Sequence, residues 1–246
     1  MILFVFEGDK VEPKIFESIE NLHFGAEKIQ IIKYGSDLPT LYAELRKNEY
    51  DLFSFLTLKE YGIQAPEGKR LDTLFSQVFL FFDYDFQNRM GVEPLNEILG
   101  EMLEFFDDET ENGKLYINYP MVESLKYTKE LPDENYWRYE VSRQVCVEHR
   151  FKRESESFAF ADAKGFRFLN VRKHDNAELR NTWKMLIHQN VCKANYIISG
   201  DNSIPSDKAD VNQKVLFAAQ VSKYVTAKES VAILNSFPLF LYEYFR

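Results

Sequence analysis

Acidic residues directly follow two apolar segments of this sequence. Glu7 follows the run Ile2–Phe6, and Asp83 and Asp85 follow the run Val78–Phe82. Short, continuously apolar runs rich in β-branched and aromatic residues are typical of buried strands. If the chain stays extended beyond the second run, Asp83 and Asp85 point to the same side, because side chains alternate along a strand. Ligands of open α/β sheets bind outside the carboxyl ends of the strands, so these carboxylates occupy positions where a site is expected.

Two further acidic residues belong to the same pattern. Glu12 follows Glu7 closely, and Glu123 follows another short apolar segment, Leu115–Ile117. Carboxylates that share one crevice repel each other and raise each other's pKa. A fold tolerates this repulsion when a hard cation lies between the carboxylates, and Mg²⁺ prefers oxygen ligands. Such a cation activates water and stabilises charge on a phosphodiester, while Glu7 beside it could instead carry protons.

A helix start is the alternative explanation for some of these acids. Glu12 precedes Pro13, which suits a first helical turn, and a carboxylate there is stabilised by the positive end of the helix. Asp37 is interpreted mainly as the N-cap of a following helix, since Asp accepts hydrogen bonds from free backbone N–H groups. For Glu12 both explanations stay open. Asp83 directly follows two phenylalanines and Asp85 comes two residues later, so they are the stronger candidates for a site.

Two motifs in this order resemble the toprim fold. The first is the segment Phe4–Pro13, with the sequence FVFEGDKVEP, and the second is the segment Phe81–Asp85, with the sequence FFDYD. The first motif is most similar to that of the RloB-like and OLD-like toprim proteins of bacterial anti-phage defence, in which EGxxTEP is common. Val11 stands where these proteins usually have Thr. The resemblance covers about residues 1–125.

The resemblance implies a function and a role for each acid. It implies a metal-dependent nuclease that cleaves phosphodiester bonds in DNA or RNA, as an effector of anti-phage or abortive-infection defence. Glu7 would act as general acid or base, Asp83 and Asp85 would bind Mg²⁺ or Mn²⁺, and Glu12 would be an accessory ligand. For Glu123 a metal-binding role and a structural role are both open.

Apolar runs and helical spacings alternate through the first half of the chain. The expected strands are 2–6, 29–34, 78–82 and 115–117. The expected helices begin at Pro13 or cover 38–45, 52–61 and 94–106, with a break at Pro66–Gly68. This alternation predicts an α/β fold with a mostly parallel, four-stranded sheet flanked by helices, which the resemblance identifies as toprim-like or Rossmann-like.

The pattern changes after Glu148. We expect an additional strand at 166–171 and helices at 178–198 and 212–245, with a break near Ser203–Pro205. The chain is therefore divided into a toprim-like catalytic core at 1–149 and a mostly helical C-terminal region at 150–246.

The charge of the 246-residue chain is unevenly distributed. The total of −9 argues against a nucleic-acid partner, but residues 1–149 hold 15 basic and 29 acidic residues, while 150–193 hold 10 basic and 5 acidic residues. A solvated helix face explains most such runs. Alternatively, the basic segment holds a phosphate backbone. The candidates for nucleic-acid binding are Lys126, Arg150, Lys152 and Arg153.

The two cysteines, Cys146 and Cys192, do not make a disulfide framework. Cys192 lies on a helical stripe with Trp183, His188 and Tyr196. A zinc site would need closer Cys/His pairs and at least one more ligand, so we interpret this stripe as packing.

The sequence contains no P-loop, so nucleotide-driven action would need a partner protein. A non-catalytic toprim-like subunit that docks on an ATPase partner and is controlled by it is therefore the alternative to a nuclease. Whether the chain forms a homo-oligomer is left open. No signal peptide is recognisable, and the apolar stretch Val231–Phe245 is shorter than a membrane span, so we expect a cytoplasmic protein without a membrane partner.

Overall fold

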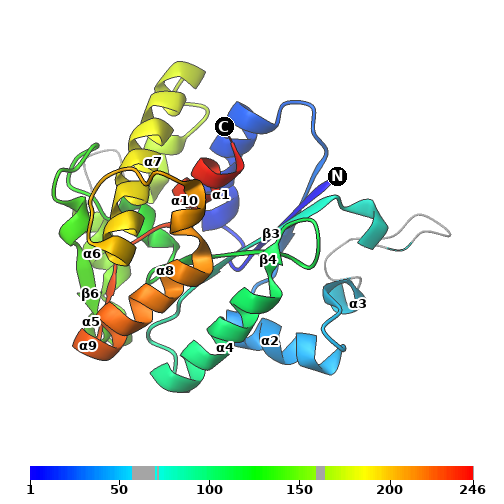
Figure 1. Ribbon diagram of the computed structural model, residues 1–246. Coiled ribbons are helices and arrows are strands. Elements are labelled where there is room, and N and C mark those ends of the chain that lie inside the picture. Colours follow the sequence, from blue (N-terminus) through cyan, green and yellow to red (C-terminus); the bar gives the residue numbers. More distant parts are fainter. Residues whose placement is uncertain (57–69, 71, 159–163, 246) are drawn as a thin grey trace.

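A five-stranded sheet forms the centre of the computed structural model, which describes residues 1–56, 70, 72–158 and 164–245 (Figure 1). The strand order is β2-β1-β3-β5-β4. Four strands run parallel and the short β4 runs antiparallel to β5. The strands are β1 (Ile2–Phe6), β2 (Ile29–Lys33), β3 (Gln77–Asp83), β4 (Asp107–Asp108) and β5 (Gly113–Asn118). The prediction of a mostly parallel α/β sheet is confirmed.

The central sheet has one strand more than the four expected from the sequence. β4 consists of two exposed aspartates, so no apolar run marks it. It pairs with the first residues of β5 through a turn that ends at Gly113, whose φ of 120° is unfavourable for residues with a side chain.

Helices cover both faces of the sheet, which explains why β1 and β3 are apolar at successive positions. Leu3, Val5 and Leu80 share one hydrophobic cluster with helices α2 (Leu38–Lys47), α4 (Val92–Phe105) and α8 (Gln213–Gln220). The opposite face packs against α1 (Val11–Ile19), the first half of α7 (Asn176–Ser199) and α10 (Ser236–Tyr244). A π-helical turn, Glu20–Phe24, extends α1, and α3 (Leu52–Leu56) follows α2.

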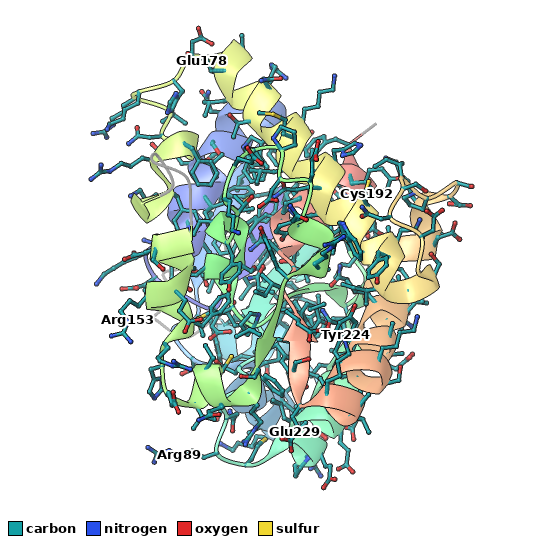
Figure 2. All side chains as sticks on the ribbon, turned by 90° about the vertical axis from the view of Figure 1, so that its left-hand side faces the viewer. Arg89, Arg153, Glu178, Cys192, Tyr224 and Glu229 are labelled. Carbon is teal, nitrogen blue, oxygen red and sulfur yellow. The ribbon has the colours of Figure 1, made fainter. Side chains whose placement is uncertain are left out.

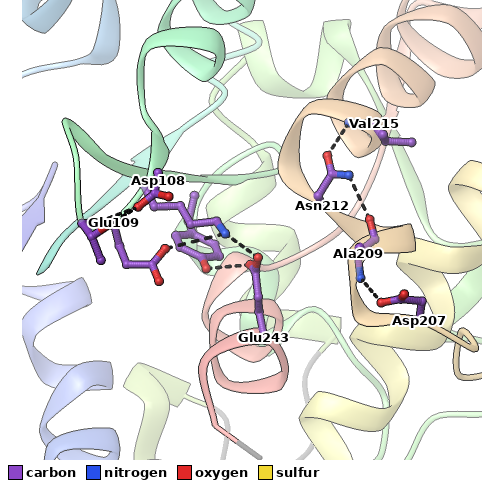
Figure 3. A network of polar contacts seen from close by, with 10 residues as sticks. Asp108, Glu109, Asp207, Ala209, Asn212, Val215 and Glu243 are labelled. Atoms are coloured by element: carbon purple, nitrogen blue, oxygen red, sulfur yellow. Dashed lines mark hydrogen bonds and ion pairs between the residues drawn. The ribbon is translucent and has the colours of Figure 1, made fainter.

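The C-terminal helix α10 packs directly on the sheet. Phe237 stacks on Phe81 with ring centroids 4.4 Å apart, and Phe240 lies 5.0 Å from Phe79. At the other end of α10, Glu243 accepts hydrogen bonds from the side chains of Lys114 and Tyr116 on β5 (Figure 3). Both hydrophobic clusters therefore combine residues from before and after residue 150. The division into two domains at this position stays a prediction.

Two expectations for the second half were wrong. The segment predicted as a strand at 166–171 begins instead with a 3-10 helix, Lys164–Leu169, because Gly165 and Phe166 turn the chain at φ values of 62° and 59°. The region predicted as helical at 212–245 is interrupted by β7 (Ser230–Ala232), which pairs with β6 (Glu140–Ser142). A short apolar run is compatible with a buried helix and a buried strand alike.

The remaining elements of the second half are short. They are α5 (Arg143–Val147), α6 (Phe151–Phe158), a π-helical turn at Val221–Val225, α9 (Thr226–Lys228) and 3-10 helices at Val122–Lys126, Tyr136–Arg138 and Lys208–Val211. Residues 57–61 of the helix expected at 52–61, and the break expected at Pro66–Gly68, lie outside the described residues. Within the part of the chain that the structure describes, no helix is long and apolar enough to cross a membrane.

Candidate functional site

Glu7 and Asp83 meet at the carboxyl ends of β1 and β3. The two strands are parallel neighbours, with Phe6 opposite Phe81. The backbone N–H of Glu7 donates to the carbonyl of Phe81 over 3.0 Å, which continues the ladder past the end of β1. The Glu7 carboxylate then reaches across to β3, where its Oε2 accepts a hydrogen bond from the backbone N–H of Asp83 over 2.8 Å. Strand pairing thus fixes the first two members of the site.

Asn118 connects Asp83 to the C-terminal helix. This buried side chain at the end of β5 donates from Nδ2 to Asp83 Oδ1 over 3.1 Å. Its own Oδ1 accepts from the backbone N–H and the hydroxyl of Ser236, the first residue of α10, over 3.0 and 2.8 Å. Asn118 therefore holds one oxygen of Asp83 in a fixed position. Asn118 was not among the residues predicted from the sequence, although a polar residue at the end of an apolar strand is a recognisable signal.

Asp85 is placed by a turn and not by the strand. β3 ends at Asp83, so the chain does not stay extended to Asp85 and strand alternation does not set the direction of this side chain. Asp85 has a φ of 52°, in the left-handed region that is costly for residues other than Gly, Asn and Asp. Tyr84, buried beside it, donates its hydroxyl to Asn96 over 2.6 Å and anchors the turn. Gln87 donates to Asp85 Oδ1 over 2.6 Å and orients the carboxylate.

Glu12 folds back over the loop that follows β1. It lies in the first turn of α1, is 3% exposed, and accepts a hydrogen bond at Oε1 from the backbone N–H of Gly8 over 2.9 Å. A Cβ atom at Gly8 would lie 2.5 Å from Glu12 Oε2, so only glycine fits there without displacing the carboxylate. Asp37 caps α2 as predicted, accepting from the backbone N–H of Thr40 over 3.0 Å. Its other oxygen accepts from Asn88 over 3.2 Å.

Glu123 enters the site from the 3-10 helix Val122–Lys126. It is buried, and its Oε1 lies 2.8 Å from Nζ of Lys152 on α6. This contact, more than any other, raises the pKa of Lys152, and the charge of Asp83 adds to the increase. Lys152, predicted from the sequence to contact nucleic acid, supplies a positive charge to this group of acids.

Glu7, Glu12, Asp83, Asp85 and Glu123, which we call the acidic cluster, bring several like charges to the carboxyl ends of the strands. Burial raises the pKa of Glu7 well above its ordinary value, and the charge of Asp85 raises it further. Burial and then the charge of Glu7 raise the pKa of Asp83 in the same way. The pKa of Asp85 rises from 3.8 to about 6 through burial and the charge of Asp37. Burial also raises the pKa of Glu12, with Glu123 among the contributing charges.

The chemistry of the acidic cluster suits a hard cation. All the atoms that could bind a metal in the acidic cluster are carboxylate oxygens, the ligands that hard cations prefer, and their charges interact at the strand ends. Of these carboxylates, only Glu123 forms an ion pair with Lys152. The side chains are not yet arranged closely enough to coordinate a cation. Within the described ranges, no three His, Cys, Asp or Glu side chains are grouped closely enough to hold a metal ion. Binding would therefore require these side chains to draw together around the cation.

The other residues predicted to bind nucleic acid differ in their surroundings. Lys126 is 2% exposed, pairs with Glu156 over 3.1 Å and lies over the ring of Phe166, so its ammonium group is buried and paired within the protein. Arg150 is half-buried and pairs with Glu148 over 2.8 Å. Arg153 is exposed and projects away from the molecule (Figure 2). Of these candidates, Arg153 is the best placed for an external anion.

Comparisons of this chain with models of protein families, with curated proteins and with solved structures each found no match.

Proposed function

We propose that this protein is a metal-dependent nuclease of the toprim type, which hydrolyses phosphodiester bonds of DNA or RNA. The observation that supports this most is the meeting of Glu7 and Asp83 at the ends of two adjacent parallel strands, with Asp85 in a left-handed turn beside them. The raised pKa values add support, because they are typical of groups placed for chemistry at the expense of stability.

Each acid of the cluster has a distinct role in this proposal. Mg²⁺ or Mn²⁺, when bound, supplies positive charge for the scissile phosphate and lowers the pKa of water. Asp83 and Asp85 hold the cation, and Asn118 and Gln87 orient them by hydrogen bonds.

Glu7, whose pKa burial raises well above its ordinary value, is the group that exchanges a proton with the reacting groups. Glu12 and Glu123 are accessory carboxylates, since each is already bound to a group of the protein.

Only the sequence resemblance supports the biological setting that we propose. The segment Phe4–Pro13 resembles the corresponding motif of RloB-like and OLD-like proteins, which supports an effector role in anti-phage or abortive-infection defence. Arg153 supplies a positive charge at the surface for the nucleic-acid backbone.

Cleavage assays test the catalytic proposal. Wild type, Glu7→Gln and the double variant Asp83→Asn/Asp85→Asn are incubated with DNA and RNA in the presence of Mg²⁺ or Mn²⁺. Removing a positioned acid–base group is expected to lower the rate roughly 100-fold or more. Glu17→Gln, which changes an exposed acid of α1, is the matched control and should cut like wild type. If the substituted proteins cut as well as wild type, the acidic cluster is not the catalytic site.

One observation favours the alternative of a non-catalytic subunit docked on an ATPase partner. The described side chains do not form a three-ligand group. A subunit of this kind would bind Mg²⁺ weakly, so millimolar Mg²⁺ would leave its melting temperature unchanged, and its size on a calibrated column would increase with the partner. Full metal-dependent cleavage by the isolated chain would exclude this alternative.

A further inference from the structure

A cavity of about 570 Å³ lies beside the turn that carries Asp85. Residues between Phe86 and Asn96, which include the start of α4, form one wall, and residues in and next to α5 and α9 form the other. Because α4 follows β3, its first turn lies at the carboxyl ends of the strands, as the acidic cluster does. The lining contains no residue of the acidic cluster, and Glu229, labelled in Figure 2, lies at the rim. The cavity is thus a neighbour of the proposed nuclease site and separate from it.

Arg143 gives this cavity a positive charge. It is the first residue of α5, and its backbone N–H donates to the carbonyl of Glu229 over 2.9 Å, which fixes it beside the rim. Glu140, on the preceding strand β6, pairs with Lys228 over 2.9 Å. Within the described ranges, the side chain of Arg143 forms neither an ion pair nor a hydrogen bond. The cavity therefore contains a cation that no described carboxylate neutralises.

The terminal nitrogens of the Arg143 guanidinium can reach a ligand. The Nε atom is buried and has no hydrogen-bond partner in the part of the chain that the structure describes. The two terminal nitrogens are not buried in this way, since Arg143 is partly exposed and borders the cavity. A guanidinium presents these nitrogens as a planar pair of donors, which fits two oxygens of a phosphate group. The accessible end of Arg143 is thus suited to an anion with several oxygens.

Arg143 also lies near the turn that positions Asp85. Burial raises the pKa of Tyr84, and the positive charge of Arg143 offsets part of this increase, so the guanidinium is close to the Tyr84 side chain. Tyr84 donates its hydroxyl to Asn96 in the cavity wall, and its ring lies 5.5 Å from that of Phe86, centre to centre. Arg143 forms no ion pair with Asp85 itself. An anion on this guanidinium would therefore lie next to the acidic cluster without occupying it.

The other charges at the cavity determine how strongly an anion is held. α4 begins at Val92, after Gly91, which has no side chain to cap the helix, so the positive end of the helix dipole borders the cavity. Glu93 and Glu229 are exposed at the rim and repel an anion. A small free phosphate compound is therefore bound weakly. A polymer that also contacts the protein elsewhere is bound more strongly, because linked contacts raise the effective concentration at each site.

We propose that Arg143 binds, in this cavity, a backbone phosphate of the nucleic-acid strand that flanks the scissile phosphate. The inference rests on the proposed nuclease function, because it assigns a second contact to the same substrate. Two observations select this ligand: an accessible guanidinium without a partner, and a cavity at the same edge of the sheet as the acidic cluster.

Fluorescence anisotropy with labelled single-stranded DNA and RNA oligonucleotides, each tested separately on the full chain, examines this contact. Buffer with a metal chelator prevents metal-dependent cleavage during the measurement. Arg143→Gln should raise the dissociation constant about tenfold or more, since a hydrogen-bonded charge pair is lost. The slope of the logarithm of affinity against the logarithm of salt concentration should fall by about 0.7, as expected for one phosphate contact to a single strand. Arg143→Lys retains the charge and should restore part of the affinity.

Arg46→Gln is the matched control. Arg46 is an exposed arginine in the last turn of α2, and this helix starts at the carboxyl ends of the strands, so Arg46 lies towards the opposite edge of the sheet. This variant should bind like wild type. Arg143→Gln should also keep the melting temperature of wild type, because the Arg143 side chain makes no hydrogen bond within the described residues. A loss of binding at an unchanged melting temperature separates a ligand contact from a structural role.

The phosphate contact and the nuclease can fail separately. Equal dissociation constants and equal salt slopes for wild type and Arg143→Gln would overturn the contact, even if wild type cleaves nucleic acid. The contact is also overturned if wild type binds no oligonucleotide. If adenosine monophosphate binds as tightly as the oligonucleotides and requires Arg143, the ligand is a free phosphate ester and not a strand. Binding that requires Arg143, without cleavage in Mg²⁺ or Mn²⁺, would support the contact and reject the nuclease.

Discussion

At the scale of single residues, Gly8 shows how tightly the site is built. Its missing side chain leaves room for the Glu12 carboxylate, which closes on the Gly8 N–H. Gly8→Ala should expel that carboxylate, leave the N–H without its partner and lower the free energy of unfolding by about 1–3 kcal/mol in urea denaturation. Nuclease activity should fall in parallel.

Gly100 provides the matched control for this substitution. It lies inside α4, where a Cβ would meet nothing closer than 3.8 Å. Gly100→Ala should therefore raise stability by about 0.5–1 kcal/mol, as expected for a helix interior. Equal effects of the two substitutions on the free energy of unfolding would show that a side chain at Gly8 does not displace the Glu12 carboxylate.

Because the pKa of Asp85 is raised, removing its charge should increase the stability of the folded protein by an amount that depends on pH. A carboxyl group whose folded-state pKa is about 6, against an ordinary 3.8, favours the folded state below pH 4, and this benefit is lost as pH rises through 6. In metal-free buffer, Asp85→Asn should therefore be more stable than wild type at pH 8, by on the order of 2–3 kcal/mol, with the gain vanishing towards pH 4. Asn also tolerates the left-handed backbone at this position.

Asp108 should behave in the opposite way. This exposed carboxylate accepts hydrogen bonds from Thr110, which lower its pKa, so its contribution to stability is present at neutral pH and is lost as pH falls. Asp108→Asn should lower stability at pH 8 and have no effect in acid. Melting temperatures recorded from pH 4 to pH 8 compare the two variants, and parallel curves for wild type and Asp85→Asn would contradict the prediction.

At the scale of elements, Asn118 joins three segments, because it binds Asp83 on β3 and Ser236 on α10 from the end of β5. Asn118→Ala should leave buried polar groups without partners and lower the free energy of unfolding by about 2 kcal/mol. The loss of cleavage should exceed what the loss of folded protein explains, since Asp83 is no longer oriented. Asn112→Ala, at an exposed position in the turn before β5, should change neither property.

Elements with a continuous apolar pattern were predictable from the sequence. Strands β1 and β3 agree with the prediction to within one residue at each end, because Glu7 ends the first run and polar residues lie on both sides of the second. The polar β4 and the short β7 were missed, since neither carries a pattern that distinguishes a strand from other structure.

The same contrast applies to the site. The meeting of Glu7 and Asp83 follows from parallel pairing of two recognisable strands. The contacts of Gln87, Asn118 and Lys152 depend on turns and on helices far along the chain, so spacing alone could not indicate them.

At the scale of the whole molecule, the two halves share their cores. The aromatic face of the sheet that carries Phe79 and Phe81 is covered by Phe237 and Phe240 of α10. A fragment of residues 1–149 should therefore expose this face, bind a hydrophobic dye and lose its near-ultraviolet circular dichroism, while the full chain unfolds in one cooperative transition. A fragment that folds with native aromatic signals would instead establish 1–149 as an autonomous domain.

The bond between Asn118 and Ser236 spans 118 positions of the chain. At a ribosomal rate of about 5–20 residues per second, β5 leaves the exit tunnel roughly ten seconds before α10 does. During that interval Asp83 can already meet Glu7, but the amide that orients it is not itself held. If the acidic cluster cuts nucleic acid, the messenger and ribosomal RNA beside the nascent chain would thus not be cut until α10 docks.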